Sequence, residues 1–342
     1  MGIVHFLNVR DGDCSIIQHA TGRVTVIDVC NARARTPQVK ALDEALAKAA
    51  IRGNFNQKDY PVNPIAYLEQ LGITSIFRFI STHPDMDHLD GIRALFAAFP
   101  PTNFWDTGND KKMGSWEGSR YDEADWRLYR SIRDGTIDDG PKRLVLYAGE
   151  SGKYWSRGDD GEGGDGLQIL APTPHLISGA NSSGDHNDGS YVILYRSAGG
   201  RVIFAGDSHD DTWEYILENY ADDVKDVDLL IAPHHGRKSG RSYKFLDAVN
   251  PTLTLFGNAS SEHLAYPAWN YRKLPFVTNN QAGSIVIDTN VKPMAVYVTN
   301  EAYAKRENAY TFYSRTHHAY YIGQVKTHAD LALARLAALL TS

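Results

Sequence analysis

The chain is poor in cysteine, in basic charge and in long apolar runs. Its only two cysteines among 342 residues, Cys14 and Cys30, follow neither a disulfide framework nor a zinc-ribbon spacing. A net charge of −6 excludes a general polyanion binder, so any contact with nucleic acid must be local. No stretch approaches the roughly eighteen apolar residues of a membrane span, and the N-terminus lacks the pattern of a signal peptide. We therefore expect a soluble, cytoplasmic protein without a membrane partner.

The apolar residues follow strand and helix periodicities along most of the chain. They make up 42% of the sequence, enough for a large core. Strands that first follow one another and later alternate with helices predict a layered α/β arrangement in one domain. The expected strands are residues 3–9, 15–18, 24–29, 75–81, 167–170, 191–195, 202–205, 227–232, 252–256, 284–287 and 294–298. The expected helices are residues 38–51, 64–71, 88–99, 211–220, 242–249, 269–273 and 328–340, and residues 107–165 are expected to be mostly loop.

One segment concentrates side chains that bind metals. Residues 80–92 read ISTHPDMDHLDGI and place His83, Asp85, Asp87 and His88 between an expected strand and an expected helix. Imidazole and carboxylate together suit Zn, Mn or Fe, and carboxylates can bridge two adjacent cations. An aspartate such as Asp87 can also cap a helix, but capping does not explain the two histidines. The pattern therefore predicts a metal site.

Two later strand ends carry residues of the same kind. Asp207 follows the strand expected at 202–205, and His234 and His235 follow the strand expected at 227–232. The ends of strands on one side of a sheet are where α/β proteins place their sites. We therefore expect these three segments to meet.

The segments resemble the metallo-β-lactamase superfamily. Residues 83–88 are similar to its H-x-H-x-D-H signature, in the H-x-D-x-D-H form typical of ComEC-like DNA-uptake competence proteins and their soluble relatives. Other similar segments are FLNVRDGD at 6–13, VID at 26–28, NDGS at 187–190, IFAGD at 203–207, DLLIAPHHG at 228–236 and GSI at 283–285. The resemblance implies a four-layer αββα sandwich. It implies a hydrolase domain over residues 1–300, with insertions near 30–60 and 110–140, and a C-terminal extension, 301–342, packed on it.

Some positions depart from the family pattern. Asn8 replaces the opening aspartate, Arg237 stands where a serine follows H-H-G, and Tyr266 replaces the histidine of a later Gly-His-Pro. The usual third-motif histidine is absent in the ComEC-like family as well, although His186 stands close to its place here. These departures leave open whether a second metal site is complete.

The resemblance implies a site with two divalent ions, Zn or Mn, that lower the pKa of a water and supply hydroxide. His83 and Asp85 would hold one ion, Asp87 and His88 the other, with Asp207 as the bridge. Either His234 or His235 would complete the ligand set or contact the leaving oxygen of the substrate. The implied metal ligands are His83, Asp85, Asp87, His88, Asp207 and His234, and the implied catalytic residues are Asp87 and His235. Residues expected to orient the ligands are Asp28, Asp13 and Asn187.

The substrate class is suggested by the cations next to His234 and His235. Residues 234–244 read HHGRKSGRSYK, in which Arg237, Lys238 and Arg241 are placed to hold phosphates, although such runs are equally often a solvated face. Asn109, Lys111 and Lys112 are further residues that could line the mouth of the site.

Together with the resemblance, this basic run predicts a metal-dependent hydrolase of phosphodiester bonds, foremost a DNA nuclease with nucleic acid as its substrate. One alternative is a hydrolase of a small phosphodiester such as a cyclic nucleotide, or of an ester or lactam. Another is a non-catalytic module with a degraded metal site. The sequence gives no oligomeric state.

Overall fold

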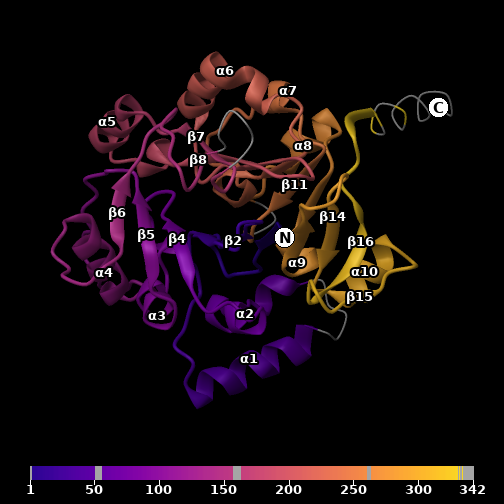
Figure 1. Cartoon of the computed structure of the whole chain (residues 1–342), viewed down its shortest axis with the longest axis horizontal. Coiled ribbons are helices and arrows are strands. Elements are labelled where there is room, and N and C mark those ends of the chain that lie inside the picture. Colours follow the sequence, from indigo (N-terminus) through magenta and orange to yellow (C-terminus); the bar gives the residue numbers. More distant parts are fainter. Residues whose placement is uncertain are drawn as a thin grey trace.

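The computed structural model describes residues 2–50, 56–156, 163–259, 263–329, 331 and 333. Within this part of the chain the strands form two sheets (Figure 1). The strands of the larger sheet are β1 (Ile3–Phe6), β2 (Ser15–Gln18), β3 (Val24–Ile27), β4 (Ile76–Ile80), β5 (Pro101–Asp106), β6 (Lys142–Val145), β13 (Ile285–Asp288), β14 (Ala295–Val298), β15 (Tyr313–Ser314) and β16 (Ala319–Gln324). Those of the smaller sheet are β7 (Leu167–Ala171), β8 (Val192–Arg196), β9 (Arg201–Phe204), β10 (Leu229–Ile231), β11 (Leu253–Phe256) and β12 (Phe276–Thr278).

The order of the strands explains how distant segments become neighbours. The larger sheet runs β15-β16-β14-β13-β1-β2-β3-β4-β5-β6, and the smaller runs β12-β11-β10-β9-β8-β7. β3, β4 and β5 are parallel, as are β9, β10 and β11. The carboxyl ends of each parallel set therefore share one edge of their sheet, where α/β proteins place their sites.

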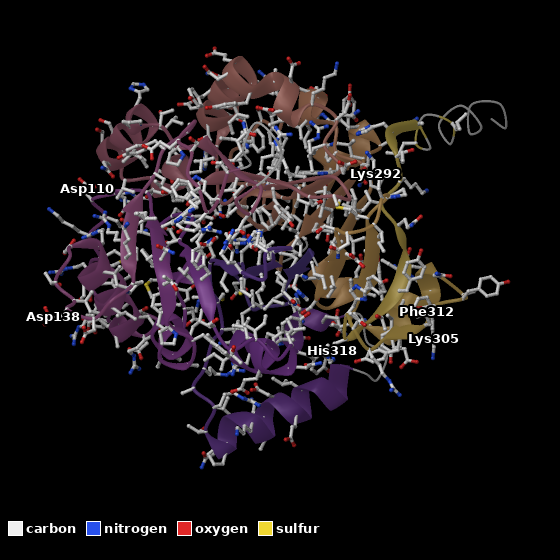
Figure 2. All side chains as sticks on the ribbon, viewed as in Figure 1. Asp110, Asp138, Lys292, Lys305, Phe312 and His318 are labelled. Atoms are coloured by element: carbon white, nitrogen blue, oxygen red, sulfur yellow. The ribbon has the colours of Figure 1, made fainter. Side chains whose placement is uncertain are left out.

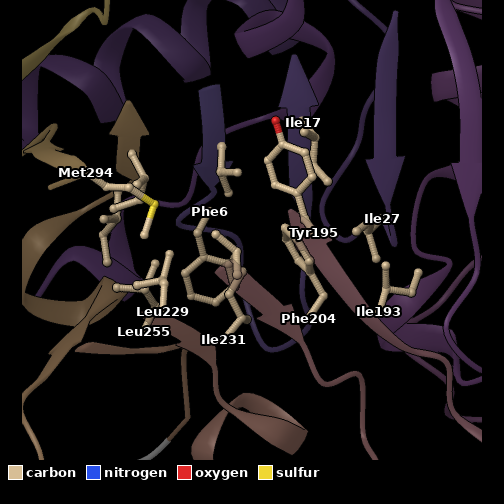
Figure 3. Close-up of a cluster of buried hydrophobic side chains, with 14 of the residues drawn as sticks. Phe6, Ile17, Ile27, Ile193, Tyr195, Phe204, Leu229, Ile231, Leu255 and Met294 are labelled. Atoms are coloured by element: carbon tan, nitrogen blue, oxygen red, sulfur yellow. The ribbon is translucent and has the colours of Figure 1, made fainter. Parts of the chain in front are cut away.

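The main core lies between the two sheets. Alternate residues of β1, Val4 and Phe6, belong to one buried cluster with Phe204 of β9 and Ile231 of β10 (Figure 3). Side chains alternate across a strand, so the other residues of the inner strands face outward. The outward face of each sheet must then be covered by helices.

Helices cover both outer faces. They are α1 (Pro37–Ala50), α2 (Pro64–Gln70), α3 (Ile92–Ala98), α4 (Glu123–Arg133), α5 (Pro174–Ser183), α6 (Asp210–Val224), α7 (Leu246–Val249), α8 (Tyr266–Arg272), α9 (Asn279–Ala282) and α10 (Glu301–Glu307). Leu68 of α2 and Tyr129 of α4 pack in one cluster with Phe79 of the larger sheet. Trp213 of α6 packs in another with Leu230 of the smaller sheet. The helix–sheet–sheet–helix order confirms the predicted αββα sandwich.

The structure corrects several sequence-based boundaries. The helix expected at 88–99 begins only at Ile92, because Met86–His88 forms a separate 3₁₀ turn and Gly91 adopts a left-handed φ of 90°. The loop expected at 107–165 contains α4, which Asp122 caps by accepting from the backbone nitrogen of Ala124 at 2.8 Å. The helix expected at 328–340 falls mostly outside the described residues.

Residues 301–324 belong to the fold at the edge of the larger sheet. They form α10, β15 and β16, and β16 pairs antiparallel with β14. The division into a domain and a packed extension stays a prediction. In the described part of the chain, no helix has the length and apolar character needed to cross a bilayer.

Candidate metal centre

The metal-binding side chains lie where strands of both sheets end. His83, Asp85, Asp87 and His88 follow β4 of the larger sheet, while Asp207 follows β9 and His234 and His235 follow β10 of the smaller sheet. His83, His88, Asp207 and His235 are buried. The structure therefore brings together, from both sides of the sandwich, the three segments that the sequence singled out.

Asp207 lies at the middle of this group. Its Oδ1 is 3.4 Å from Nε2 of His88, and its Oδ2 is 3.7 Å from Nε2 of His83 and 3.9 Å from Nε2 of His235. Asp87 approaches from the side, with Oδ2 at 3.5 Å from Nε2 of His235 and 4.0 Å from Nε2 of His88. Asp87, His88 and His235 offer ligand atoms within 4.8 Å of one another, and so do His83, His88 and Asp207.

The atoms that face this centre have no partner among the described residues. Nε2 of His83, His88 and His235 and Oδ1 of Asp207 are buried and make no hydrogen bond. A buried polar atom without a partner costs free energy, so several at one point call for a missing group. Imidazole nitrogens and carboxylate oxygens are ligands for Zn, Mn and Fe. The residues present therefore fit a divalent cation.

Hydrogen bonds set the proton positions of His83 and His88. Nδ1 of His88 is 2.8 Å from Oδ2 of Asp28 and donates to that carboxylate. The Thr82 hydroxyl donates to the same Oδ2 at 2.6 Å, so it can only accept from Nδ1 of His83, at 3.1 Å. Both rings thus keep their Nε2 lone pair for the centre, as metal-bound histidines do.

The adjacent residues His234 and His235 differ in the group that faces Nδ1 of each ring. Nδ1 of His235 lies 2.9 Å from Oδ1 of Asp13, which leaves Nε2 as the ligand atom. Nδ1 of His234 accepts from the guanidinium of Arg241 at 2.7 Å, and a guanidinium can only donate. A neutral His234 therefore carries its proton on Nε2, which lies 3.6 Å from Oδ2 of Asp207. A protonated nitrogen donates a hydrogen bond and cannot bind a metal.

The carboxylates draw positive charge into the centre. Burial would raise the pKa of Asp207, but the imidazoles around it, His88 first, hold that pKa well below its ordinary value. Burial would lower the pKa of His88, yet Asp207, Asp28 and Asp87 raise it well above the ordinary value. The pKa of His235 rises to about 10 in the same way. Burial lowers the pKa of His234 to about 3, so this ring stays neutral. A cation would take the place of protons at His88 and His235.

The backbone at the site is unusual. Asp28, His234 and His235 have positive φ angles of 57°, 50° and 57°, which non-glycine residues rarely adopt. Such conformations persist where the surrounding structure holds them, often at functional sites. A side chain at Gly12 would place its Cβ 1.7 Å from the backbone oxygen of Asp87. Only glycine lets the turn after β1 lie this close to the ligand segment.

Other predicted residues are placed less directly. Asp85 is partly exposed and pairs with Lys111, with its Oδ2 4.0 Å from Nε2 of His83. Asn187 lies in the 3₁₀ turn His186–Gly189, and its Oδ1 is buried without a partner among the described residues. Ser190, in the same part of the chain, contacts Asp207: its Oγ accepts from the backbone nitrogen of Asp207 at 3.2 Å.

The basic run next to His235 divides into two kinds of residue. Arg241 is buried, and its guanidinium donates to the backbone oxygens of Ser208, at 2.9 Å, and of Asp207. Arg237 and Lys238 make no ion pair with any described residue, and Nε of Arg237 is buried without a partner there. Arg241 thus holds the ligand segments in place, whereas Arg237 and Lys238 form no ion pair within the described part of the chain.

Sequence patterns gave no sign of Thr82 as a support of the ligands, and they placed Ser190 in the family-like segment 187–190 without a role. Thr82 lies next to His83, and its backbone nitrogen also donates to Oδ1 of Asp28 at 2.7 Å. The one available signal was adjacency to a ligand, since a hydroxyl residue at a strand end is common for many reasons.

The chain matches no model of a protein family and no curated protein. Among solved structures it is similar to a metal-dependent hydrolase of the β-lactamase superfamily, with 14% identity, 81% of this chain and 96% of that chain covered, and a TM-score of 0.46. It is also similar to a diphosphatase from the PhnP family, with 12% identity, 82% and 96% covered, and a TM-score of 0.41. A metallo-β-lactamase family protein from Thermus thermophilus has 16% identity, 65% and 69% covered, and a TM-score of 0.27. These similarities are too distant to transfer a substrate or a mechanism.

Proposed function

We propose that this chain is a metal-dependent hydrolase of the metallo-β-lactamase superfamily that cleaves phosphodiester bonds, foremost in DNA, in the manner of ComEC-like proteins. The observation that carries the proposal is the set of buried ligand atoms without hydrogen-bond partners on His83, His88, His235 and Asp207, near the cations Arg237 and Lys238, which make no ion pair with a described residue. A divalent ion, Zn or Mn, would satisfy the atoms of His88, His235 and Asp207, and phosphate oxygens would satisfy the two cations.

The residues of the site divide into ligands and residues that hold them. We assign Asp87, His88, Asp207 and His235 to a divalent ion, because the ligand atoms of Asp87, His88 and His235 lie within 4.8 Å of one another and Asp207 lies 3.4 Å from His88 and 3.9 Å from His235. Asp28 and Asp13 orient the two histidines through their Nδ1 atoms. When bound, such an ion lowers the pKa of a water and stabilises negative charge on the attacked phosphorus.

His234 has a separate role in this proposal. Because its Nε2 carries the proton, it donates a hydrogen bond to an oxygen of the substrate rather than binding the ion. In this assignment His235 is the metal ligand and His234 contacts the substrate. The resemblance alone implied the reverse, with His234 as the ligand and His235 as the catalytic residue.

The ligand assignment predicts different metal contents for two variants. His235→Ala is expected to lose bound metal, because it removes a ligand, whereas His234→Ala is expected to retain it. Elemental analysis of both proteins after dialysis tests this. Loss of metal from His234→Ala with retention in His235→Ala would reverse the assignment.

The proposal as a whole predicts that the purified protein contains a divalent transition metal. A strong chelator is expected to remove the metal together with hydrolysis of DNA or of a chromogenic phosphodiester, and added Zn or Mn is expected to restore both. Elemental analysis coupled to a nuclease screen measures this. A protein that holds no metal and takes up none would be the non-catalytic module instead.

A small phosphodiester such as a cyclic nucleotide is the second candidate substrate. The net charge of −6 favours it, since a chain with negative charge repels a long polyanion. Cleavage of cyclic nucleotides with no measurable cleavage of DNA would select this alternative.

A further inference from the structure

The sequence predicts two positions for cations, and the structure surrounds these positions with different side chains. One position is lined by Asp87, His88 and His235, whose ligand atoms lie within 4.8 Å of one another, and Asp207 is 3.4 Å from His88 and 3.9 Å from His235. The other lies next to His83, whose ligand atom is grouped with those of His88 and Asp207, and here Asp85 was expected to serve as a further ligand. In the described part of the chain, Asp85 belongs to none of the groups whose ligand atoms all lie within 4.8 Å of one another. The two positions are therefore not equivalent.

Asp85 already pairs with a positively charged side chain. The ammonium of Lys111 pairs with Oδ1 of Asp85, while Oδ2 of the same carboxylate is 4.0 Å from Nε2 of His83. The side chain of Lys111 is only 19% exposed. The carboxylate next to His83 is thus already paired with a positive charge that belongs to the chain itself.

Lys111 is held in place by its surroundings. Its backbone nitrogen donates to Oδ1 of Asn109 at 3.1 Å, and its backbone oxygen accepts from Arg133 at 2.8 Å. Asn109 is buried and donates to the hydroxyl of Tyr129 at 2.6 Å. The preceding Asp110 lies at the outer surface of the molecule (Figure 2). The segment after β5 is therefore fixed so that Lys111 points to Asp85.

The positive charge of Lys111 also acts on His186. His186 is buried, and its Nδ1 has no hydrogen-bond partner among the described residues. Burial first, and then the charge of Lys111, lower the pKa of His186, while Asp85 acts in the opposite direction. Lys111 thus acts on both Asp85, the expected ligand, and His186, the residue close to the place of the missing third-motif histidine.

We propose that the ammonium of Lys111 takes the place of the second divalent ion, so that the chain holds one ion, at Asp87, His88, Asp207 and His235. This inference rests on the proposed function and replaces the expected two ions with one ion and one lysine. In that role Lys111 is a positioning residue that neutralises Asp85 and presents a fixed positive charge to a phosphate oxygen. Unlike a metal ion, an ammonium activates no water, so the water comes from the single ion.

Metal stoichiometry tests the proposal. The metal-free protein is titrated with Co²⁺, and bound ions are counted by elemental analysis and by the visible absorption of the protein-bound ion. The wild-type chain is expected to bind one ion tightly. Lys111→Met, which keeps the length of the side chain and removes its charge, is expected to bind a second ion, while Lys111→Arg is expected to remain at one.

Two comparisons make the result decisive. Lys112→Met alters the neighbouring exposed lysine and is expected to bind one ion like the wild type. Circular dichroism and thermal unfolding confirm that each variant folds, and Lys111→Gln provides a second neutral variant if Lys111→Met does not. Two equally tight ions in the wild type, or a single ion in both neutral variants, would overturn the proposal. A wild-type chain that binds no metal at all would instead overturn the proposed function.

Discussion

The Asp207→Ala variant is expected to lose phosphodiester hydrolysis by more than about a thousandfold, which corresponds to roughly 4 kcal/mol in the activation barrier. Asp207 is the carboxylate at the middle of the centre, where its oxygens lie 3.4 Å from Nε2 of His88 and 3.7 Å from Nε2 of His83. Without it, these rings lose the negative charge that draws a cation between them. Asp87→Ala removes a ligand from the other side and is expected to act in the same direction. Initial rates at saturating metal measure both effects.

Two controls separate chemistry from folding. Asp207→Asn keeps the shape of the buried side chain and is expected to be as inactive as the alanine variant, with a thermal midpoint closer to wild type. Asp211 is exposed on α6, close along the chain, so Asp211→Ala is expected to keep full activity. A loss of less than about tenfold in Asp207→Ala, about 1.4 kcal/mol, is too small for a metal ligand and would move the active site elsewhere.

Replacing Arg237 and Lys238 together by alanine is expected to weaken DNA binding by about ten- to a hundredfold while changing hydrolysis of a small chromogenic phosphodiester much less. A polymer has further phosphates that reach beyond the metal centre to these side chains, whereas a small substrate needs only the centre. Each phosphate contact contributes roughly 0.7 to 0.9 to the slope of log K against log salt, so the slope is expected to fall by about 1.4 to 1.8. Fluorescence titrations at several salt concentrations measure this.

The control variant removes two positive charges from another part of the surface. Lys40 and Lys225 are exposed on α1 and at the end of α6, and their double alanine variant is expected to bind DNA nearly as well as wild type. Equal losses with the polymer and the small substrate would mean that Arg237 and Lys238 support the metal centre or the fold. No loss with either substrate would mean that the run is only a solvated face. Arg241 is left intact in this test because its guanidinium holds the backbone of Asp207.

The sequence was sufficient to predict the layers and the convergence of the ligand segments. Apolar runs mark the strands, and a ligand-type residue directly after a run must lie at a sheet edge, as Asp207 after β9 does. Residues 107–165 were harder, because α4 lies among glycines and charges and is identified mainly by Asp122 and by buried residues such as Trp126 and Tyr129.

The proton positions on His234 and His235 could not be predicted from the sequence. His234 and His235 are adjacent and chemically identical, and they differ only in what faces Nδ1. Arg241 donates to Nδ1 of His234, whereas the carboxylate of Asp13 lies 2.9 Å from Nδ1 of His235. Asp13 lies more than two hundred residues away along the chain, so no local pattern could reveal the difference. The same holds for Lys111, whose partner Asp85 comes from another strand end.

The division of the proposed ligands between the two sheets bears on how this protein acquires its metal during folding. Asp87 and His88 belong to the larger sheet, and Asp207 and His235 to the smaller one. Neither sheet alone offers more than two of these four ligands. The larger sheet, moreover, is completed only when β13, near residue 285, pairs with β1 near the N-terminus. Contacts so distant along the chain form late, after the entropy of closing the long loop has been overcome. A metal ion would therefore bind only after the two sheets have docked, and it would then stabilise their contact. It could not nucleate the folding of either sheet.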